Sequence, residues 1–564
     1  MSEGARDGAR DTLDVPVISF MIPYLALNLA VGLYAARNTR TITDFVLAGR
    51  RLPFFVVVTS MFAMFFGAET TLGASYNMAA TGLSGDVVAD PYGAALCLIV
   101  YGLFYAMPLY NTNNLTLSDF YCERYGPKLG VFSAVINTIG YLLWTAGQII
   151  GLGVVTSRTW GVPKEVGSLI CTAIIMVYTF RGGMYAVAWT ECLESVVIVV
   201  CLIVMTVEVG GRTQTGWAEA YTRFDETMAP DPELADRAKA WLNHFALWAY
   251  LGIGSVPSQD IYERMNSAMN AQHARFGALV AGVAYIMAAQ MPLYFGMIAR
   301  AKYNADNCAG DALGCEGVDI SELDEGIILD TLNALVSPGV RVVFYAALVS
   351  AILSTASGTM LGAGVLLTVN IVRPALPSVP DSKLLLMSRI ATVVFATCAY
   401  AFTFTGERIS DFVNISSVWL MVGLFWPLTF GLYWSRATAV GAGFSMFTGA
   451  ASYTVLFLVA RNDTARGGDG DGFLLYELDT ATWAMLLALG AFVFGSLMPT
   501  AWQGAVDGAM DRALGWMPLF QNRAGMIIKV DQAPLAAGNA ISAKTAAAGG
   551  GAFTRGTAAP MVRF

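Results

Sequence analysis

The chain has 564 residues, of which 56% are hydrophobic and only 13% are charged. Average soluble domains carry about a quarter charged residues, so this composition excludes a string of ordinary soluble domains. The net charge of −8 comes from the segments between long apolar runs and says little about partners.

These apolar runs are long enough to cross a bilayer as helices. A transmembrane helix needs about 20 apolar residues, and a helix satisfies its own backbone hydrogen bonds in lipid. The start, MSEGARDGARDTLD, lacks a signal-peptide pattern, so we expect the first run to remain as an anchor. We predict an all-α membrane protein with thirteen spans, the fifth and seventh short, near residues 16–36, 54–80, 90–109, 129–157, 165–180, 184–208, 240–257, 275–301, 339–368, 386–405, 411–433, 439–460 and 481–500.

The charges between the spans predict the orientation. With the N-terminus outside, the acidic connections lie outside, including Asp86, Asp90, residues 209–238 and residues 306–330. Positive charge in the cytoplasm is the expected bias. We therefore predict a multi-pass protein of the plasma membrane, a bacterial inner membrane, with a cytoplasmic C-terminus. The basic residues that this orientation places inside are Arg37, Arg40, Arg50, Arg51, Arg181, Arg264, Arg275, Arg373, Lys383 and Arg436.

Cysteine and histidine usage gives little support to an enzyme. Cys308 and Cys315 stand seven residues apart in the outer acidic loop and could form a disulfide in an oxidising compartment, a pairing that the sequence leaves open. The only histidines are His244 and His273, and no CxxC or His-rich metal spacing occurs. We therefore expect neither a metalloenzyme nor a nucleophilic enzyme.

Two of the predicted spans are interrupted by polar and conformationally permissive residues. The second contains the sequence FGAETT at residues 66–71, and the seventh contains GIGSVPSQD at residues 252–260. Transporters form binding sites where corresponding helices of inverted repeats are broken near mid-membrane. The pair therefore indicates two repeats, spans 2–6 and spans 7–11. Glycine and proline also serve helix packing alone, an interpretation that remains open for each interruption taken singly.

The ninth span carries two adjacent hydroxyls, Ser354 and Thr355, with Ala351 one turn before them. Such hydroxyls often bond back to the preceding carbonyls of their own helix. Sodium, however, is a hard cation that prefers several oxygen ligands. Two hydroxyls beside the unwound carbonyls of the second span would supply them without a full charge in lipid.

Five motifs follow one another along the chain, within a resemblance that extends over about residues 40–440. They are DFVLAGRRLP, LTLSDFYCERYG, TFRGGMYAVAWTECLESV, GSVPSQDIYERMNSA and AILSTASGTMLGAGVLLTVNI. With them the chain resembles the solute:sodium symporters, which have the LeuT-type fold. The resemblance implies a secondary transporter that moves a small solute inward with sodium. It also implies a sodium site made by the carbonyls of Ala63, Phe66 and Ala351 and by the side chains of Ser354 and Thr355.

This reading divides the chain into six regions. The core is a five-plus-five inverted repeat, with one additional helix before it and two after it. In chain order we expect an outer tail at 1–15, an extra helix at 16–36, repeats at 54–208 and 240–433, two further helices at 439–500, and a largely disordered cytoplasmic tail at 501–564.

At several positions this chain differs from the family branches that carry sugars, choline or proline, and these differences restrict the solute that we expect. Tyr92 and Tyr285 align with a glutamate and a lysine of sugar carriers, so a sugar is not expected. Ser258 replaces a tryptophan of the choline branch, which weakens an aromatic cage for a quaternary amine. Phe65 replaces an aspartate of the proline carriers and puts proline in doubt.

The candidate solute site gathers around Glu69, because a carboxylate inside a membrane span indicates function by default. It could bind a cationic or polyol-like group or accept a proton; alternatively, it only hydrogen-bonds the unwound backbone. Glu191 and Glu194 replace an aspartate and a glutamine that the family links to the exit path of the cation. We assign Glu191 to that path and expect the solute to contact Glu69, Thr70, Tyr92, Ser258, Gln259, Asn414 and Trp419.

The sequence thus predicts a sodium-coupled symporter that imports a small polar organic solute by alternating access. Its coupling ion would be Na⁺, and its partners would be the solute and the lipid bilayer, without nucleic acid; the oligomeric state is left open. A proton-coupled symporter of the same fold, or a solute sensor with the same membrane core, is the alternative.

Overall fold

The protein is helical throughout the part that the computed structural model describes. Within these residues no β-strand forms, and only two isolated bridges occur, Leu52–Ala268 and Asn114–Lys529. The predicted all-α architecture is therefore confirmed. The described residues are 14–83, 87–213, 237–303, 325–376, 378–405, 408–465, 480–514 and 529–530.

The N-terminal half contains one long helix followed by the first group of core helices. Several core helices continue through short π-helical stretches or are broken by bends. The elements are α1 (Val15–Ala35), α2 (Ile42–Leu47), α3 (Phe54–Phe65), η5 (Glu69–Gly73), α4 (Ala74–Thr81), η6 (Val88–Gly93), α5 (Ala94–Val100), η7 (Tyr101–Tyr105), α6 (Ala106–Asn111), α7 (Leu117–Tyr125), α8 (Pro127–Trp160) and α9 (Lys164–Thr213).

The C-terminal half contains the second group of core helices and then three peripheral helices. Its elements are α11 (Arg237–Gly252), α12 (Gln259–Asn266), α13 (Ala271–Tyr303), α14 (Ile327–Leu335), α15 (Pro338–Val365), η10 (Leu366–Val372), α16 (Arg373–Ala375), α17 (Asp381–Phe402), α18 (Ile409–Leu420), η12 (Met421–Phe425), α19 (Trp426–Tyr433), α20 (Ala439–Ala465), α21 (Thr480–Leu497) and α22 (Thr500–Leu514).

A sharp bend at Gly183 divides the long helix α9. Gly183 has φ 54° and ψ −145°, a backbone conformation that L side chains rarely adopt. A Cβ at this position would lie 2.5 Å from the carbonyl oxygen of Phe45. The glycine therefore allows α2 to approach α9, and it separates the two segments predicted as spans five and six.

Ten helices of the described residues are long and apolar enough to cross a membrane, or eleven if the bent pair Phe54–Phe65 and Glu69–Thr81 counts as one span. The predicted spans five and seven are the ones missing from this set. The first part of α9 and the 16-residue α11 are helical where those spans were expected. The count of thirteen spans stays a prediction.

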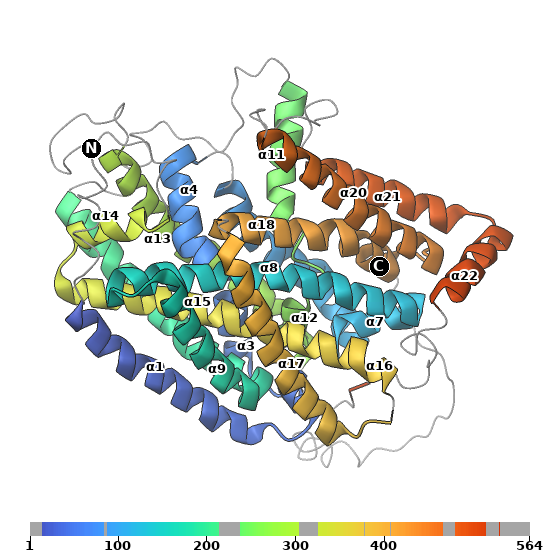
Figure 1. Cartoon of the computed structure of the whole chain (residues 1–564), viewed down its shortest axis with the longest axis horizontal. Helices are drawn as coiled ribbons and strands as arrows, with labels where there is room; N and C mark the ends of the chain where they lie inside the picture. Colours follow the sequence, from blue (N-terminus) through green and yellow to red (C-terminus); the bar gives the residue numbers. More distant parts are fainter. Residues whose placement is uncertain are drawn as a thin grey trace, which may run out of the picture.

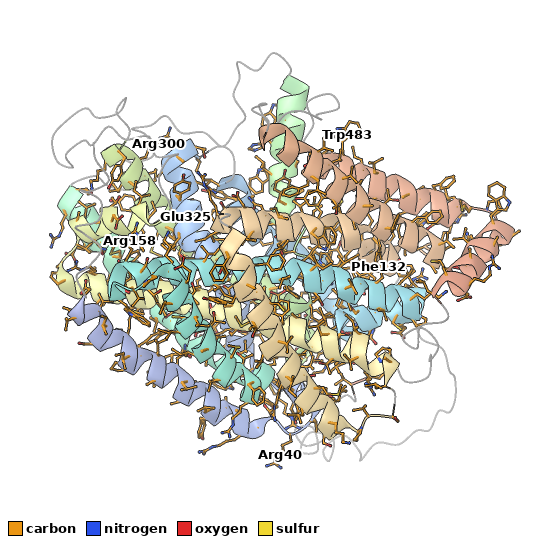
Figure 2. The ribbon with its side chains drawn as sticks, in the orientation of Figure 1. Arg40, Phe132, Arg158, Arg300, Glu325 and Trp483 are labelled. Carbon is orange, nitrogen blue, oxygen red and sulfur yellow. The ribbon has the colours of Figure 1, made fainter. Side chains whose placement is uncertain are left out.

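The helices form a bundle in which α8 and α15 cross the middle, as Figure 1 shows. Helix α1 lies along one edge, and α20 and α21 lie side by side along the opposite edge. Figure 2 shows Arg40, which follows α1, at the other end of the molecule from Arg300 near the end of α13. Helices α3 and α12 lie near this central region, whereas α4 and α11 extend toward the top of the view (Figure 1).

Some predictions fall outside the described residues. They concern Asp86, most of the two acidic connections at 209–238 and 306–330 with Cys308 and Cys315, and most of the C-terminal tail.

Candidate functional site

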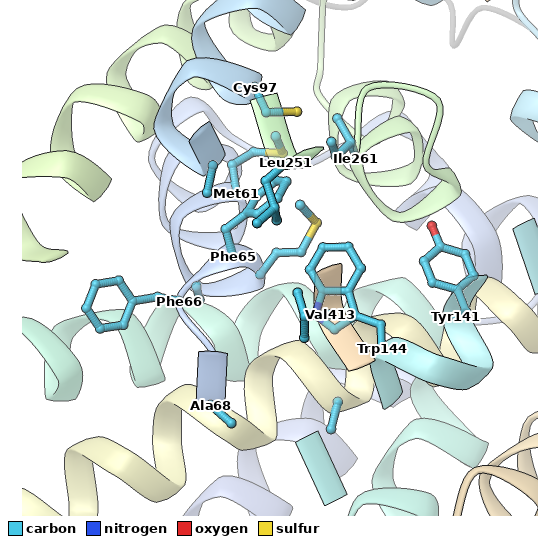
Figure 3. Close-up of a cluster of buried hydrophobic side chains, with 14 of the residues drawn as sticks. Met61, Phe65, Phe66, Ala68, Cys97, Tyr141, Trp144, Leu251, Ile261 and Val413 are labelled. Carbon is cyan, nitrogen blue, oxygen red and sulfur yellow. The ribbon is translucent and has the colours of Figure 1, made fainter. Parts of the chain in front are cut away.

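The second predicted span is broken at the position that the sequence indicates. Helix α3 ends at Phe65, helical structure resumes at Ala68 and Glu69, and the two parts are bent by 56°. Phe66 has φ −89° and ψ 69°, outside the helical region. Figure 3 shows the Phe66 ring pointing away from the side of Phe65 and Trp144, with Ala68 on the segment beyond the break.

The hydroxyls of α15 face the end of α3. Ser354 Oγ lies 2.9 Å from the Ala63 carbonyl oxygen and 2.6 Å from that of Ala351. Thr355 Oγ1 lies 3.4 Å and 3.3 Å from the same two oxygens. Back-bonding within α15 explains the contacts to Ala351 but not those to Ala63, which belongs to another helix. Four oxygens thus converge in a set that suits a hard cation.

Glu69 lies next to this oxygen set. A Cβ built on Gly67 would lie 2.4 Å from Glu69 Oε2, 2.7 Å from Gln148 Oε1 and 2.7 Å from Thr355 Oγ1, so these polar ends meet around the glycine. Gln148 Nε2 donates to Glu69 Oε2 at 2.5 Å, and Trp144 Nε1 donates to Oε1 at 3.2 Å. A side chain at this position would require these polar groups to shift.

Two residues of α8 therefore complete the surroundings of Glu69, and the sequence analysis missed both. Gln148 also accepts from the Ala68 N–H at 2.9 Å, which ties the break to α8. The sequence feature that could have identified Gln148 is the presence of a polar glutamine within the apolar run WTAGQIIGLG. The alternative in which Glu69 only bonds unwound backbone does not account for its contacts with two side chains.

The seventh predicted span is also broken, between Gly252 at the end of α11 and Gln259 at the start of α12. Ser258 precedes α12, and its buried hydroxyl has no hydrogen-bond partner among the described residues. Gln259 is engaged elsewhere, because it accepts from Leu117 N at 2.7 Å and donates to Glu263 Oε1 at 3.0 Å. Of the two, Ser258 has the free polar group.

Three other residues of the predicted solute set form no hydrogen bond to Glu69 within the described residues. The Tyr92 hydroxyl is 3.4 Å from Gln290 Oε1, Trp419 Nε1 donates to the Ile136 carbonyl at 3.0 Å, and Asn414 is half-buried on α18.

Asp90 is a correction to the sequence analysis, which placed it in an outer connection. The structure buries it, with 8% of its surface exposed. Thr70 Oγ1 lies 3.1 Å from Asp90 Oδ2, and the Tyr285 hydroxyl donates to Oδ1 at 2.7 Å. In the sequence, a carboxylate beside the end of an apolar run looks like a loop residue. The burial of Asp90 follows from the packing of η6 against η5, which the sequence pattern does not show.

Arg264 is a second correction, because it does not lie in a cytoplasmic connection. It is fully buried and forms an ion pair with Glu191, whose carboxylate also accepts from Ser60. Arg264 further donates to the Asp260 carbonyl at 3.1 Å. Glu194 is buried as well and accepts from Asn28 of α1. The Glu191 pair links α9, α12 and α3.

Comparisons with known proteins agree with this architecture. The chain is 25% identical to high-affinity choline transporter 1 of Caenorhabditis elegans, with 77% of this chain and 76% of that protein covered. It is 24% identical to the high-affinity proline transporter PutP of Bacillus subtilis (strain 168), with 82% and 94% covered. It is 22% identical to sodium/glucose cotransporter 4 of Danio rerio, with 78% and 71% covered.

The fold has a solved counterpart as well. A structure of a Na⁺-coupled sialic acid symporter in a substrate-bound outward-open state superposes with a TM-score of 0.65 at 16% identity, covering 86% of this chain and 97% of that one. This likeness confirms the predicted LeuT-type fold. The profile of the sodium:solute symporter family matches residues 45–449. The chain is a transporter rather than an enzyme, and it belongs to the sodium:solute symporter family.

Proposed function

We propose that this protein is a sodium-coupled symporter that imports a small polar organic solute by alternating access. The main support for the proposal is the position of two hydroxyls of α15 beside a carbonyl of α3. Ser354 Oγ and Thr355 Oγ1 lie 2.9 and 3.4 Å from the Ala63 carbonyl oxygen. Similar transporters named for choline, proline and glucose support a small organic solute.

Sodium bound between Ala63 on α3 and Ser354 on α15 would hold two core elements together. The Phe66 and Ala351 carbonyls would complete the oxygen shell in this proposal. The ion would stabilise the arrangement in which the break in the second span is formed, and its inward release would loosen it. One charge moving inward gains about 2.3 kcal/mol per 100 mV. Coupling is reciprocal, so sodium and solute raise each other's affinity by the same factor.

The experiment is uptake by proteoliposomes of labelled amines, amino acids, carboxylates and polyols under an inward sodium gradient. At equal pH on both sides, uptake of at least one compound should require sodium and should increase with a negative interior potential. Empty liposomes provide the control. Failure of every compound to accumulate under either a sodium or a pH gradient would instead favour a sensor.

Proton coupling through Glu69 is the second candidate mechanism. Glu69 is buried in the broken span, and within the described residues its carboxylate contacts Gln148 and Trp144 rather than a basic side chain. Such a group could carry a proton. Uptake that follows a pH gradient and persists without sodium would establish this mechanism in place of the first.

We also propose an outside N-terminus and a cytoplasmic C-terminus, in the plasma membrane of a bacterium. A cysteine replacing the exposed Arg40, between α1 and α2, should react with an impermeant thiol reagent only from the cytoplasmic side. A cysteine replacing the exposed Gly339, at the start of α15, should react only from outside. The opposite labelling pattern would reverse the topology.

A further inference from the structure

We propose that the solute is a small organic ammonium cation, whose charged group is bound by Asp90 together with Thr70 and Tyr285. The inference rests on the proposed function, because it names the class of solute that the symporter carries. It assigns a role to Asp90, which lies beside the break in the second span.

The first step is the convergence of polar groups from four elements on one point. Thr70 Oγ1 on η5 lies 2.6 Å from the Tyr285 hydroxyl on α13 and 3.1 Å from Asp90 Oδ2 on η6. The Phe65 carbonyl, at the end of α3, lies 3.1 Å from both hydroxyls. One carboxylate, two hydroxyls and one carbonyl thus form a set of acceptors that an ammonium group can bind with its N–H groups.

The second step concerns charge. Glu69 and Asp90 are both buried, and within the described residues neither carboxylate forms an ion pair. Arg264, the buried arginine of this region, is already paired with Glu191. A charge in a membrane interior is costly unless a partner of opposite sign is present. Sodium beside Thr355 would balance Glu69, and a cationic solute would balance Asp90.

The third step concerns the aromatic rings packed around Tyr285, whose hydroxyl donates to Asp90. Three rings approach the Tyr285 ring, with centroid distances of 6.3 Å for Phe62, 6.4 Å for Phe65 and 5.6 Å for Phe66. Trp144 follows at 5.8 Å from Phe65. Aromatic faces attract cations and also contact apolar substituents. Ser258 replaces a tryptophan of the choline branch, so one such ring is missing at that position. The rings described here are separate from it, because they belong to α3 and the following Phe66, to α8 and to α13.

The fourth step excludes the opposite charge. A carboxylate or phosphate group of a solute placed against Asp90 would meet a like charge in a buried site. This repulsion would lower the affinity for an anionic solute. A neutral polyol could bond the hydroxyls but would leave Asp90 without a partner. An ammonium ion satisfies both the hydrogen bonds and the charge.

The test compares ligands of similar shape that differ in charge or in the presence of an N–H group. In sodium-containing proteoliposomes we measure binding and uptake of choline, of dimethylethanolamine, and of 3,3-dimethylbutan-1-ol, the neutral isostere of choline. The cations should bind about tenfold or more tightly than the isostere. Preference for dimethylethanolamine over choline is expected, because only the protonated amine has an N–H group that it can donate to Asp90. The reverse order would overturn binding through an N–H group.

The variant Asp90→Asn should reduce affinity for the preferred cation about tenfold or more, with little change for the isostere. Asp330→Asn removes a carboxylate whose side chain is 49% exposed, far from this cluster in sequence, and serves as the matched control. If Asp90→Asn does not fold, Tyr285→Phe keeps the ring, removes one hydroxyl and should still lower cation affinity.

The outcomes separate the two levels of the proposal. Sodium-driven uptake of a neutral or anionic compound, with the cations neither transported nor competing, would overturn the cationic solute and leave the symporter intact. If the unaltered protein binds two sodium ions and Asp90→Asn binds only one, the cluster binds sodium. The proposal of a cationic solute is then overturned as well. Absence of any sodium-driven uptake in the unaltered protein would overturn the proposed function itself.

Discussion

Replacing Ser354 and Thr355 together by alanine should raise the sodium concentration for half-maximal uptake on the order of 100-fold, about 3 kcal/mol. The two hydroxyls supply two of the four oxygens that converge between α3 and α15. Both side chains are fully buried, so water cannot readily substitute for them. The measurement is solute uptake as a function of sodium concentration at fixed membrane potential.

The control for this variant is Thr368→Ala. Thr368 lies in the continuation of the same helix, is buried, and donates only to the Gly364 carbonyl at 2.9 Å. It should leave the sodium dependence unchanged. Alanine is the best helix former, so neither change should unwind the helix. Ser354→Thr keeps a hydroxyl and should be mild. Unchanged sodium dependence in the double variant would mean that these hydroxyls only donate hydrogen bonds to the Ala63 and Ala351 carbonyls and do not bind sodium.

The breaks in the helices could be predicted from sequence because they leave a local signal. Glycine, proline and adjacent polar residues stand out within an apolar run, and they mark residues 66–71 and 252–260. The structure confirms both interruptions. The hydroxyls of the ninth span stand out in the same way, and they do face the first break. Their role in binding sodium stays a prediction.

The partners of these groups could not be predicted, because they come from other helices. Hydropathy assigned Asp90 and Arg264 to connections, since a charge near the end of an apolar run resembles a loop residue. Packing buries both, Asp90 against Tyr285 and Arg264 against Glu191. Gln148 shows the same limit, since the chain separates it from Glu69 by a whole span.

The ion pair of Glu191 and Arg264 should respond strongly to the loss of one partner. Glu191→Gln would leave the guanidinium of Arg264 in a fully buried site without its anionic partner. Breaking a buried pair in this way costs about 3–5 kcal/mol. We expect a clear drop in the thermal midpoint of the detergent-purified protein. Replacing both members, in Glu191→Gln with Arg264→Met, should recover part of this loss, because the guanidinium is no longer buried without Glu191.

The same pair also bears on the cation path assigned to Glu191. A Cβ on Gly358, one turn after Ser354 and Thr355, would lie 2.3 Å from Arg264 Nη2, so the pair lies against α15 just beyond the proposed sodium site. A sodium ion leaving along α15 would meet the Glu191 carboxylate there. Glu191→Asp keeps the charge and should retain most sodium-driven uptake, whereas the double variant should fold and yet exchange sodium slowly. A double variant that transports at the normal rate would show that the pair is structural and that the cation leaves by another route.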